Sequence, residues 1–235
     1  MKTEGRNAVL ELLKTDKTVE KLLIEKGGQG TLGKIFAEAR KKGIRVQFVD
    51  RAVLDRESAD KRHQGVIAFS TDFVYAELHE LLGNEESLIV LCDGVEDVHN
   101  LGSILRVAEC AGADGVVIPK AKGATVTEAV VRISAGAAEH IAVAKVPSIP
   151  YAVEELKKYG YWIYALEAGG ENIWQEKLSG KVALVVGGED SGVRRTTLGA
   201  CDKVLSIPLY GKVNSLNASV ALGIAVYEVA RARKP

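Results

Sequence analysis

Apolar residues in the first part of the chain follow two alternating patterns. Some recur at helical spacing, and others form short continuous runs between turn-forming glycines. These patterns predict helices at residues 7–14, 31–42 and 51–60, and strands at residues 19–24, 44–49 and 65–69. The first 70 residues therefore predict a small α/β layer, whose length is within the usual lower range for a domain.

A second alternating series follows residues 71–87, which we expect to be a linker with one short helix. The series predicts strands at residues 88–91, 115–118, 141–146, 161–166, 182–186 and 204–207, and helices at residues 101–111, 127–134, 153–158 and 217–231. Short apolar strands that alternate with helices are typical of a parallel sheet covered on both faces. We therefore predict an α/β fold with two domains, residues 1–70 and 88–235.

Composition narrows the class of protein. A chain of 235 residues with 47% hydrophobic content can bury a substantial core. No apolar run approaches the length of a membrane span, and the first residues lead into a helical pattern instead of a signal peptide, so we expect a soluble cytoplasmic protein. The three cysteines and four histidines are scattered without metal-ligand spacing, and we expect no metal site.

The charge distribution indicates a second function for the first domain. The net charge is zero, but residues 1–70 contain 15 Lys and Arg against 10 Asp and Glu. A basic excess can meet the phosphates of a nucleic acid. Two ordinary solvated surfaces explain the same excess, because five charges are a modest number.

Asn100 and Arg106 lie in the segment that follows the first strand of the second series. Asn100 is placed to cap the next helix, and Arg106 lies about one and a half turns further, roughly 9 Å along the axis. The planar guanidinium of Arg106 would suit a phosphate. A plain helix cap for Asn100 and a salt bridge to Glu109 for Arg106 are the alternatives.

Two further loops place polar groups where strands end. Gly187, Gly188 and Glu189 follow one strand, and glycine there lets the backbone approach a ligand closely. Residues 214–219 place four short polar side chains at the start of an apolar helix. Helix capping explains one or two of them but not all four. A site at the edge of the sheet is therefore predicted.

These three segments resemble the three motifs of the SpoU group of RNA ribose 2′-O-methyltransferases, in the SPOUT superfamily. They read DGVEDVHNLGSILR (residues 93–106), VGGE (residues 186–189) and IPLYGKVNSLNASV (residues 207–220). The first domain is similar to the ribosomal-protein-like RNA-binding domain of the ribosomal-RNA members, through GRNAV (residues 5–9) and HQGV (residues 63–66). The resemblance covers nearly the whole chain.

The resemblance implies a SPOUT domain tied in a trefoil knot, a homodimer, and S-adenosylmethionine bound in the knotted loops. Residues that match cofactor-binding positions are Gly187, Gly188, Ile207 and Leu216. Residues that match catalytic or substrate positions are Asn100, Arg106, Glu189, Ser215 and Asn217. Arg6 and Arg62 are the candidates for RNA contact in the first domain.

The implied reaction is the transfer of a methyl group to a ribose hydroxyl in RNA. The similarity is greatest to enzymes that methylate a guanosine in the peptidyl-transferase loop of 23S ribosomal RNA. Alternatives are a transfer-RNA 2′-O-methyltransferase and a catalytically silent RNA-binding module for ribosome assembly. A nucleotide-binding oxidoreductase is disfavoured, because no glycine-rich fingerprint follows the first strand.

Overall fold

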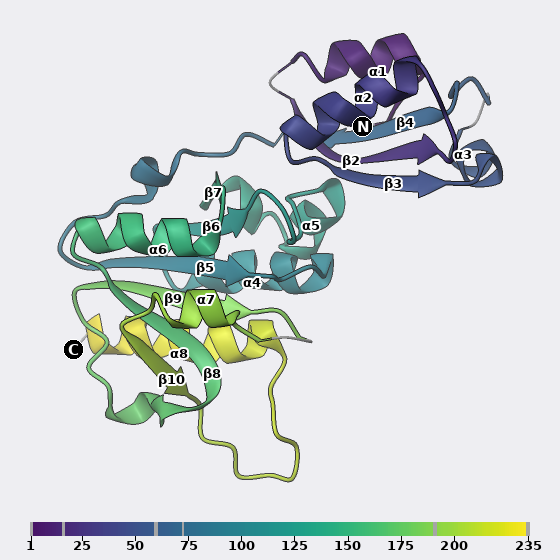
Figure 1. The fold of residues 1–235 in the computed structure, drawn as a ribbon. Helices are drawn as coiled ribbons and strands as arrows, with labels where there is room; N and C mark the ends of the chain where they lie inside the picture. The colour runs from purple at the N-terminus through teal and green to yellow at the C-terminus, as the bar shows by residue number, and fades with distance from the viewer. Residues whose placement is uncertain (1, 16, 59–60, 72, 190–191, 234–235) are drawn as a thin grey trace. The chain divides into compact units, whose positions relative to one another are not determined.

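The computed structural model describes residues 2–15, 17–58, 61–71, 73–189 and 192–233 of the chain. It divides into two compact units, residues 1–74 and 75–235 (Figure 1). The boundary between the two units lies within residues 71–87, the segment expected to be a linker with one short helix. Its first residue ends a strand of the first unit, its middle part contains a 3₁₀ helix, η1 (Leu78–Leu81), and its last residue begins a strand of the second unit.

The first unit is a four-stranded mixed sheet with the strand order β1-β4-β2-β3. β2 and β3 are parallel, and the other neighbours are antiparallel. Its strands are β1 (Lys2–Glu4), β2 (Thr18–Glu25), β3 (Arg45–Val49) and β4 (Val66–Thr71), and its helices are α1 (Arg6–Leu12), α2 (Thr31–Lys41) and α3 (Arg51–Glu57). Three residues are too short a run to show a period, so the sequence pattern did not predict β1.

Alternation along the strands divides the core of the first unit between its two faces. In β2, Leu22 and Ile24 pack with α1 and α2, whereas Leu23 packs with Leu54 of α3. Successive side chains of a strand point to opposite faces, so helices cover the sheet on both sides.

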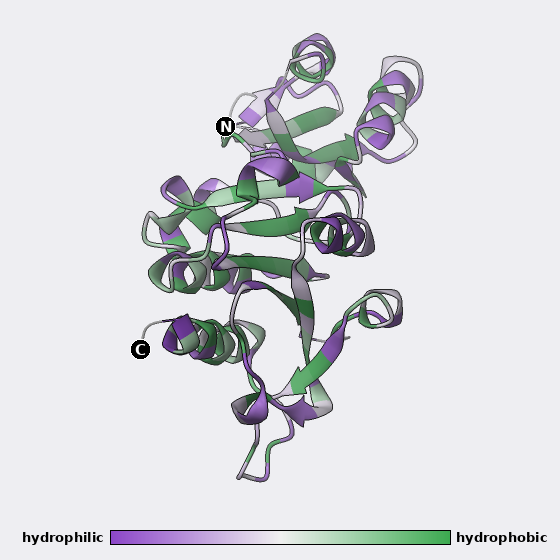
Figure 2. Ribbon diagram, turned by 90° about the vertical axis from the view of Figure 1, so that its left-hand side faces the viewer, coloured by the Kyte–Doolittle hydropathy of each residue, from purple (hydrophilic) through white to green (hydrophobic). Residues whose placement is uncertain are grey.

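The second unit is a six-stranded sheet in which every pair of neighbours is parallel, with the order β10-β8-β9-β5-β6-β7. Its strands are β5 (Ser87–Asp93), β6 (Gly115–Pro119), β7 (Ala142–Val146), β8 (Trp162–Asn172), β9 (Lys181–Gly187) and β10 (Lys203–Ser206). The central strands are buried along their whole length, and Figure 2 shows them as the most hydrophobic part of the unit. The predicted parallel sheet is confirmed.

Helices lie on both faces of this sheet. α6 (Ile149–Lys158) and α7 (Arg195–Leu198) pack together on one face, and α4 (Val98–Cys110) packs against α5 (Glu128–Ile133) and α8 (Ala218–Arg233) on the other. Two short 3₁₀ helices, η2 (Ala137–Glu139) and η3 (Ile173–Gln175), complete the unit.

β5 and β9 are neighbours at the point where the strand order reverses. The chain leaves β5 toward β6 on one side, and it leaves β9 toward β10 on the other. In parallel sheets a crevice for ligands forms outside the carboxyl ends of the two strands at such a point. Asn100 follows β5 and Glu189 follows β9, so the topology places both near this crevice.

Candidate active site

Three polar side chains from distant parts of the chain form one hydrogen-bonded cluster at this carboxyl edge. Nδ2 of Asn100 donates to Oε1 of Glu189 at 2.7 Å, and Nδ2 of Asn217 donates to the same oxygen at 2.9 Å. Asn217 also donates to Oδ1 of Asn100 at 2.9 Å. An oxygen that accepts two amide groups is typical of an ionised carboxylate. We call this the Asn–Glu–Asn cluster.

The last helix fixes the orientation of Asn217. Its Oδ1 accepts from the Ser219 amide at 2.9 Å and from the Ser219 hydroxyl at 2.6 Å, so this residue caps the start of α8. The capping oxygen faces the helix, and the amide nitrogen therefore faces Asn100 and Glu189. One side chain thus links the last helix to the other two motifs.

The alternative in which Asn100 is a plain helix cap is contradicted by the structure. α4 begins three residues earlier than predicted, because Asp97 supplies the cap and accepts from the His99 amide at 3.0 Å. Asn100 is consequently the third residue of α4, only 5% exposed, and its side chain is free to join the Asn–Glu–Asn cluster. The buried side-chain amide of Asn100 therefore bonds to the Asn–Glu–Asn cluster and does not cap α4.

Arg106 lies outside the Asn–Glu–Asn cluster. Six residues along an α-helix correspond to about one and two-thirds turns, so Arg106 lies on a different side of α4 from Asn100. It is exposed and makes no ion pair with Glu109 or with any other described residue. The guanidinium is therefore available to a ligand, whereas the alternative of a salt bridge to Glu109 is not observed.

Gly187 and Gly188 let the chain fold back at the end of β9. A Cβ on Gly187 would lie 2.0 Å from the carbonyl carbon of Gly192, and one on Gly188 would lie 2.3 Å from the carbonyl oxygen of Gly94. The protein backbone fills the space that a side chain would need. These glycines thus hold Glu189 in place, and their predicted contact with a cofactor stays a prediction.

The segment between β10 and α8 is open. Ser215 is exposed, Ile207 is half-buried, and Leu209 and Leu216 are 41% and 39% exposed. Among the described residues, none of the backbone groups of residues 207–216 makes a hydrogen bond. Figure 1 shows this loop extending away from the sheet. Apolar side chains beside unpaired donors and acceptors suit a ligand that is partly polar and partly apolar.

Two of the three cysteines, Cys92 and Cys201, have raised pKa values. Burial raises the pKa of the Cys92 thiol to about 12 and that of Cys201 to about 11, so neither supplies a thiolate at neutral pH.

No group of three His, Cys, Asp or Glu side chains in the described ranges could hold a metal ion. None of the described helices combines the length and the apolar character that crossing a membrane requires.

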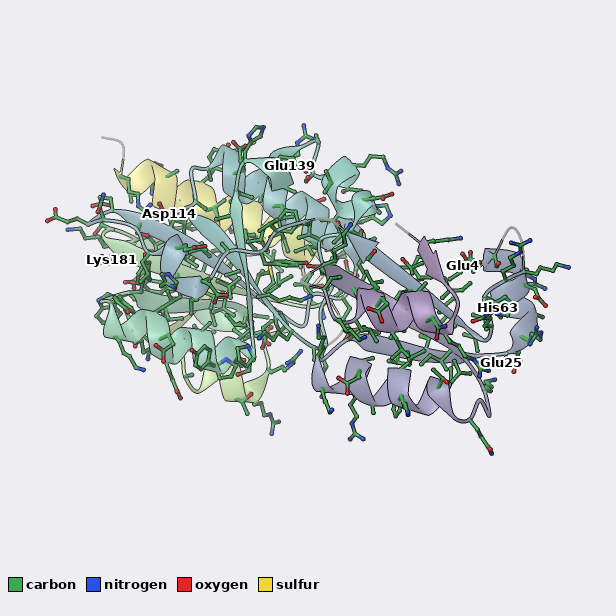
Figure 3. The ribbon with its side chains drawn as sticks, turned by 90° about the horizontal axis from the view of Figure 1, so that it is seen from above. Glu4, Glu25, His63, Asp114, Glu139 and Lys181 are labelled. Carbon is green, nitrogen blue, oxygen red and sulfur yellow. The ribbon has the colours of Figure 1, made fainter. Side chains whose placement is uncertain are left out.

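In the first unit, Arg6 and Arg62 differ in their surroundings. Nε of Arg6 donates to the carbonyl of Gln64 at 2.9 Å, and its backbone amide donates to Oε1 of Gln64 at 3.0 Å, so Arg6 holds the turn before β4. Arg62 is exposed in that same turn. His63, labelled in Figure 3, is fully buried there and pairs with Asp55 at 3.0 Å.

The sequence patterns missed Glu167 and the pair of Asp93 and Arg194. Glu167 ends the buried part of β8, and its Oε2 accepts from the Val193 amide at 2.9 Å. Asp93 is completely buried at the end of β5. A carboxylate that follows a strand is the signal that could have revealed both.

Comparison with known proteins gives matches to both units. Residues 87–227 match the SpoU rRNA Methylase family, and residues 3–76 match the family described as RNA 2′-O ribose methyltransferase substrate binding. YacO of Bacillus subtilis, assigned to the TrmH family of tRNA/rRNA methyltransferases, is 40% identical over 98% of this chain and 95% of its own length. A Staphylococcus saprophyticus protein assigned to the same family is 39% identical over 97% and 94%.

Solved structures agree with this result. An RNA 2′-O ribose methyltransferase is 26% identical with a TM-score of 0.59, and the match covers 99% of this chain and 88% of that enzyme. The A. aeolicus TrmH/SpoU tRNA modifying enzyme is 30% identical with a TM-score of 0.58, and the match covers 67% of this chain and 80% of that enzyme. AviRb of Streptomyces viridochromogenes, solved with AdoMet, shares the fold at 23% identity and a TM-score of 0.64, over 99% and 90%. The chain belongs to the SpoU family of RNA methyltransferases.

Proposed function

We propose that this protein transfers a methyl group from S-adenosylmethionine to a ribose 2′-hydroxyl in RNA. The observation that carries the proposal is the Asn–Glu–Asn cluster, which unites residues of all three family motifs beside an open loop. A catalytically silent RNA-binding module would not need side chains of all three motifs to be joined by hydrogen bonds in this way. Family membership and the AdoMet bound to AviRb support the choice of donor.

The open loop fits the cofactor. Its unpaired backbone groups can bond the polar adenosine and amino-acid parts, while Ile207, Leu209 and Leu216 offer apolar contacts. Gly187 and Gly188 present backbone at the neighbouring strand end. When bound, the cofactor supplies an activated methyl group on a sulfonium. The protein's own tasks are then to align the ribose oxygen with that methyl and to remove the hydroxyl proton.

We assign Arg106 to the phosphate beside the target ribose. A guanidinium keeps its proton at neutral pH, so Arg106 is better suited to binding an anion than to accepting a proton. Its charge would also stabilise the developing negative charge on the hydroxyl oxygen. The role of general base for this arginine is the alternative. The Asn–Glu–Asn cluster and Ser215 would orient the ribose.

We propose ribosomal RNA as the substrate, with a guanosine of the peptidyl-transferase loop of 23S RNA as the target. Two observations favour it over transfer RNA. The first unit matches a substrate-binding family, and the A. aeolicus tRNA modifying enzyme covers only 67% of this chain. Phosphate contacts from the basic first unit, including Arg62, would give affinity. Loop shape and exposed bases would give specificity.

We further propose that the protein acts in the cytoplasm as a homodimer and that its second unit contains the trefoil knot of the SPOUT superfamily. Val220 and Tyr227 are 50% and 52% exposed on α8, although the helix is otherwise largely apolar and partly buried. A second copy packed on α8 would cover them and would lie beside Arg106 on the adjoining helix α4.

Incubation of the purified protein with tritiated S-adenosylmethionine and 23S or transfer RNA tests the function. We expect label in 23S RNA, located at one ribose by primer extension. Label in transfer RNA alone would favour the alternative function, a transfer-RNA 2′-O-methyltransferase. Calorimetric titration with S-adenosylhomocysteine gives an independent result. Binding of this ligand without methyl transfer to either RNA would favour the silent module. No binding would contradict the whole proposal.

A further inference from the structure

Asp93 is a carboxylate at the carboxyl end of β5 with 0% exposure. Its Oδ2 accepts from the backbone amide of Arg194 at 2.9 Å. Its Oδ1 has no hydrogen bond in the described part of the chain, and it lies 3.5 Å from Nη1 of Arg194. A buried carboxylate is costly unless a partner compensates its charge. Arg194 therefore neutralises Asp93 within the sheet edge, although its own side chain is about one-third exposed.

The same guanidinium reaches a third segment. Nη2 of Arg194 donates to the carbonyl of Lys122 at 3.2 Å, in the loop between β6 and α5. Lys122 has a φ of 57°, a backbone conformation that is uncommon for a residue with a side chain. The donors of one arginine therefore join the loops that follow β5, β6 and β9, all at the carboxyl edge.

Backbone contacts make this junction tight. The Gly188 amide donates to the carbonyl of Asp93 at 3.1 Å, directly before Glu189 in the chain. A Cβ on Gly94 would lie 3.1 Å from Nη2 of Arg194. Asp93 thus bonds to both ends of the loop that follows β9. Its backbone carbonyl accepts from Gly188, and its carboxylate accepts from Arg194.

We propose that Arg194, through its pair with Asp93, is a positioning residue for the methyl transfer reaction. It fixes the loop that carries Glu189 relative to the start of α4, which carries Asn100, and so sets the geometry of the Asn–Glu–Asn cluster. Neither Asp93 nor Arg194 belongs to that cluster. The inference rests on the proposed function, because it names a residue that supports the same site.

The side-chain variants Arg194→Gln and Arg194→Lys test the pair, with Arg195→Gln as the matched control. Arg195 is the neighbouring arginine, and its side chain is exposed and has no partner among the described residues. We expect Arg194→Gln to lower kcat by about 10- to 100-fold, the range in which a displacement near 1 Å acts, with KM for RNA changed less than about twofold. Arg194→Lys keeps the charge but loses the planar fork, so its kcat should be intermediate.

A direct RNA contact by Arg194 would instead raise KM and leave kcat near the wild-type value, and that result would overturn the proposal. So would equal effects of Arg194→Gln and Arg195→Gln. Thermal unfolding of each variant identifies any that fails to fold, and Arg194→Lys then provides the kinetic comparison.

Hydrogen exchange separates this proposal from the proposed function. The amide of Gly188 should exchange faster in Arg194→Gln than in the wild type, whether or not the protein transfers a methyl group. Unchanged exchange at Gly188 would contradict the positioning role alone. A wild-type protein with no methyl transfer would contradict the proposed function alone.

Discussion

The two edges of the six-stranded sheet both carry polar networks, but among the described residues only the network at the carboxyl edge adjoins a long loop whose backbone groups make no hydrogen bonds. At the amino edge, Gly83 donates its amide to the Tyr161 hydroxyl at 3.0 Å, and that hydroxyl lies 2.5 Å from Oγ of Ser87. Ser87 in turn donates to Asp114 at 2.7 Å, which Figure 3 labels. Arg233 donates to the carbonyls of Ser87 and Gly180 and closes this network with the last turn of α8.

The carboxyl edge has a comparable network with a different surrounding. The Asn–Glu–Asn cluster is well bonded, yet it adjoins a loop whose backbone groups have no partner among the described residues. A network closed on itself contributes to stability, whereas a network beside unpaired groups can bind and orient a ligand. Polar residues at strand ends are therefore not sufficient to mark a site. The site is marked by the neighbouring loop, in which the backbone groups of residues 207–216 make no hydrogen bonds with the described residues.

Removal of Glu189 should give the largest effect. Glu189→Ala removes the acceptor shared by Asn100 and Asn217, and we expect methyl transfer to fall by about 100-fold. Glu85→Ala at the amino edge is the control, because Glu85 is an exposed acid before β5, and it should transfer methyl groups at the wild-type rate. Equal rates for the two variants would remove the functional difference between the edges.

A methyl group on Gly188 should destabilise the carboxyl edge. Gly188→Ala places a Cβ 2.3 Å from the Gly94 carbonyl oxygen, which requires the backbone to shift, and we expect a loss of about 3 kcal/mol in the free energy of unfolding. Urea denaturation measures it. Gly33→Ala in α2 is the matched control, since its Cβ would meet nothing within 4 Å, and it should stabilise the protein by about 0.5–1 kcal/mol.

Removal of one hydroxyl at the amino edge should affect stability and leave activity unchanged. Tyr161→Phe takes the acceptor from the half-buried Gly83 amide, and we expect the free energy of unfolding to fall by about 1–2 kcal/mol. The rate of methyl transfer per folded molecule should stay at the wild-type value. A loss of activity without a loss of stability would show that the amino edge also takes part in the reaction.

The same substitution in the open loop should have the smallest effect. Tyr210 is 92% exposed and its hydroxyl has no partner among the described residues, so Tyr210→Phe should change the free energy of unfolding by less than about 0.5 kcal/mol. Urea denaturation under the conditions used for Tyr161→Phe provides the comparison. A larger loss would mean that the loop is closed against the protein in solution.

The sequence pattern predicts the parallel sheet and most of its helices because buried strands and amphipathic helices leave strong periodic signals. It misses elements such as β1 and α7, which have three and four residues, because a period cannot be seen in so few positions. It also ends β8 at residue 166, where the apolar run stops, although the strand continues to Asn172 with partly exposed polar residues.

The candidate site could be predicted only in part. Residue types and motif resemblance identify Asn100, Glu189 and Asn217, but their meeting depends on the strand order, which the pattern does not give. The competing roles of Asp97 and Asn100 as helix cap are also undecided in the sequence, since both are good capping residues. Asp93 and Arg194 escape notice because their pairing joins residues 101 positions apart.

The role of Asn217 has a consequence for biosynthesis. This asparagine lies directly before α8, so the cluster is incomplete until α8 has been synthesised and has docked on α4. A nascent or truncated chain that lacks α8 would keep the folded RNA-binding unit but no assembled centre. Docking of α8 on α4 is therefore the step that completes the Asn–Glu–Asn cluster.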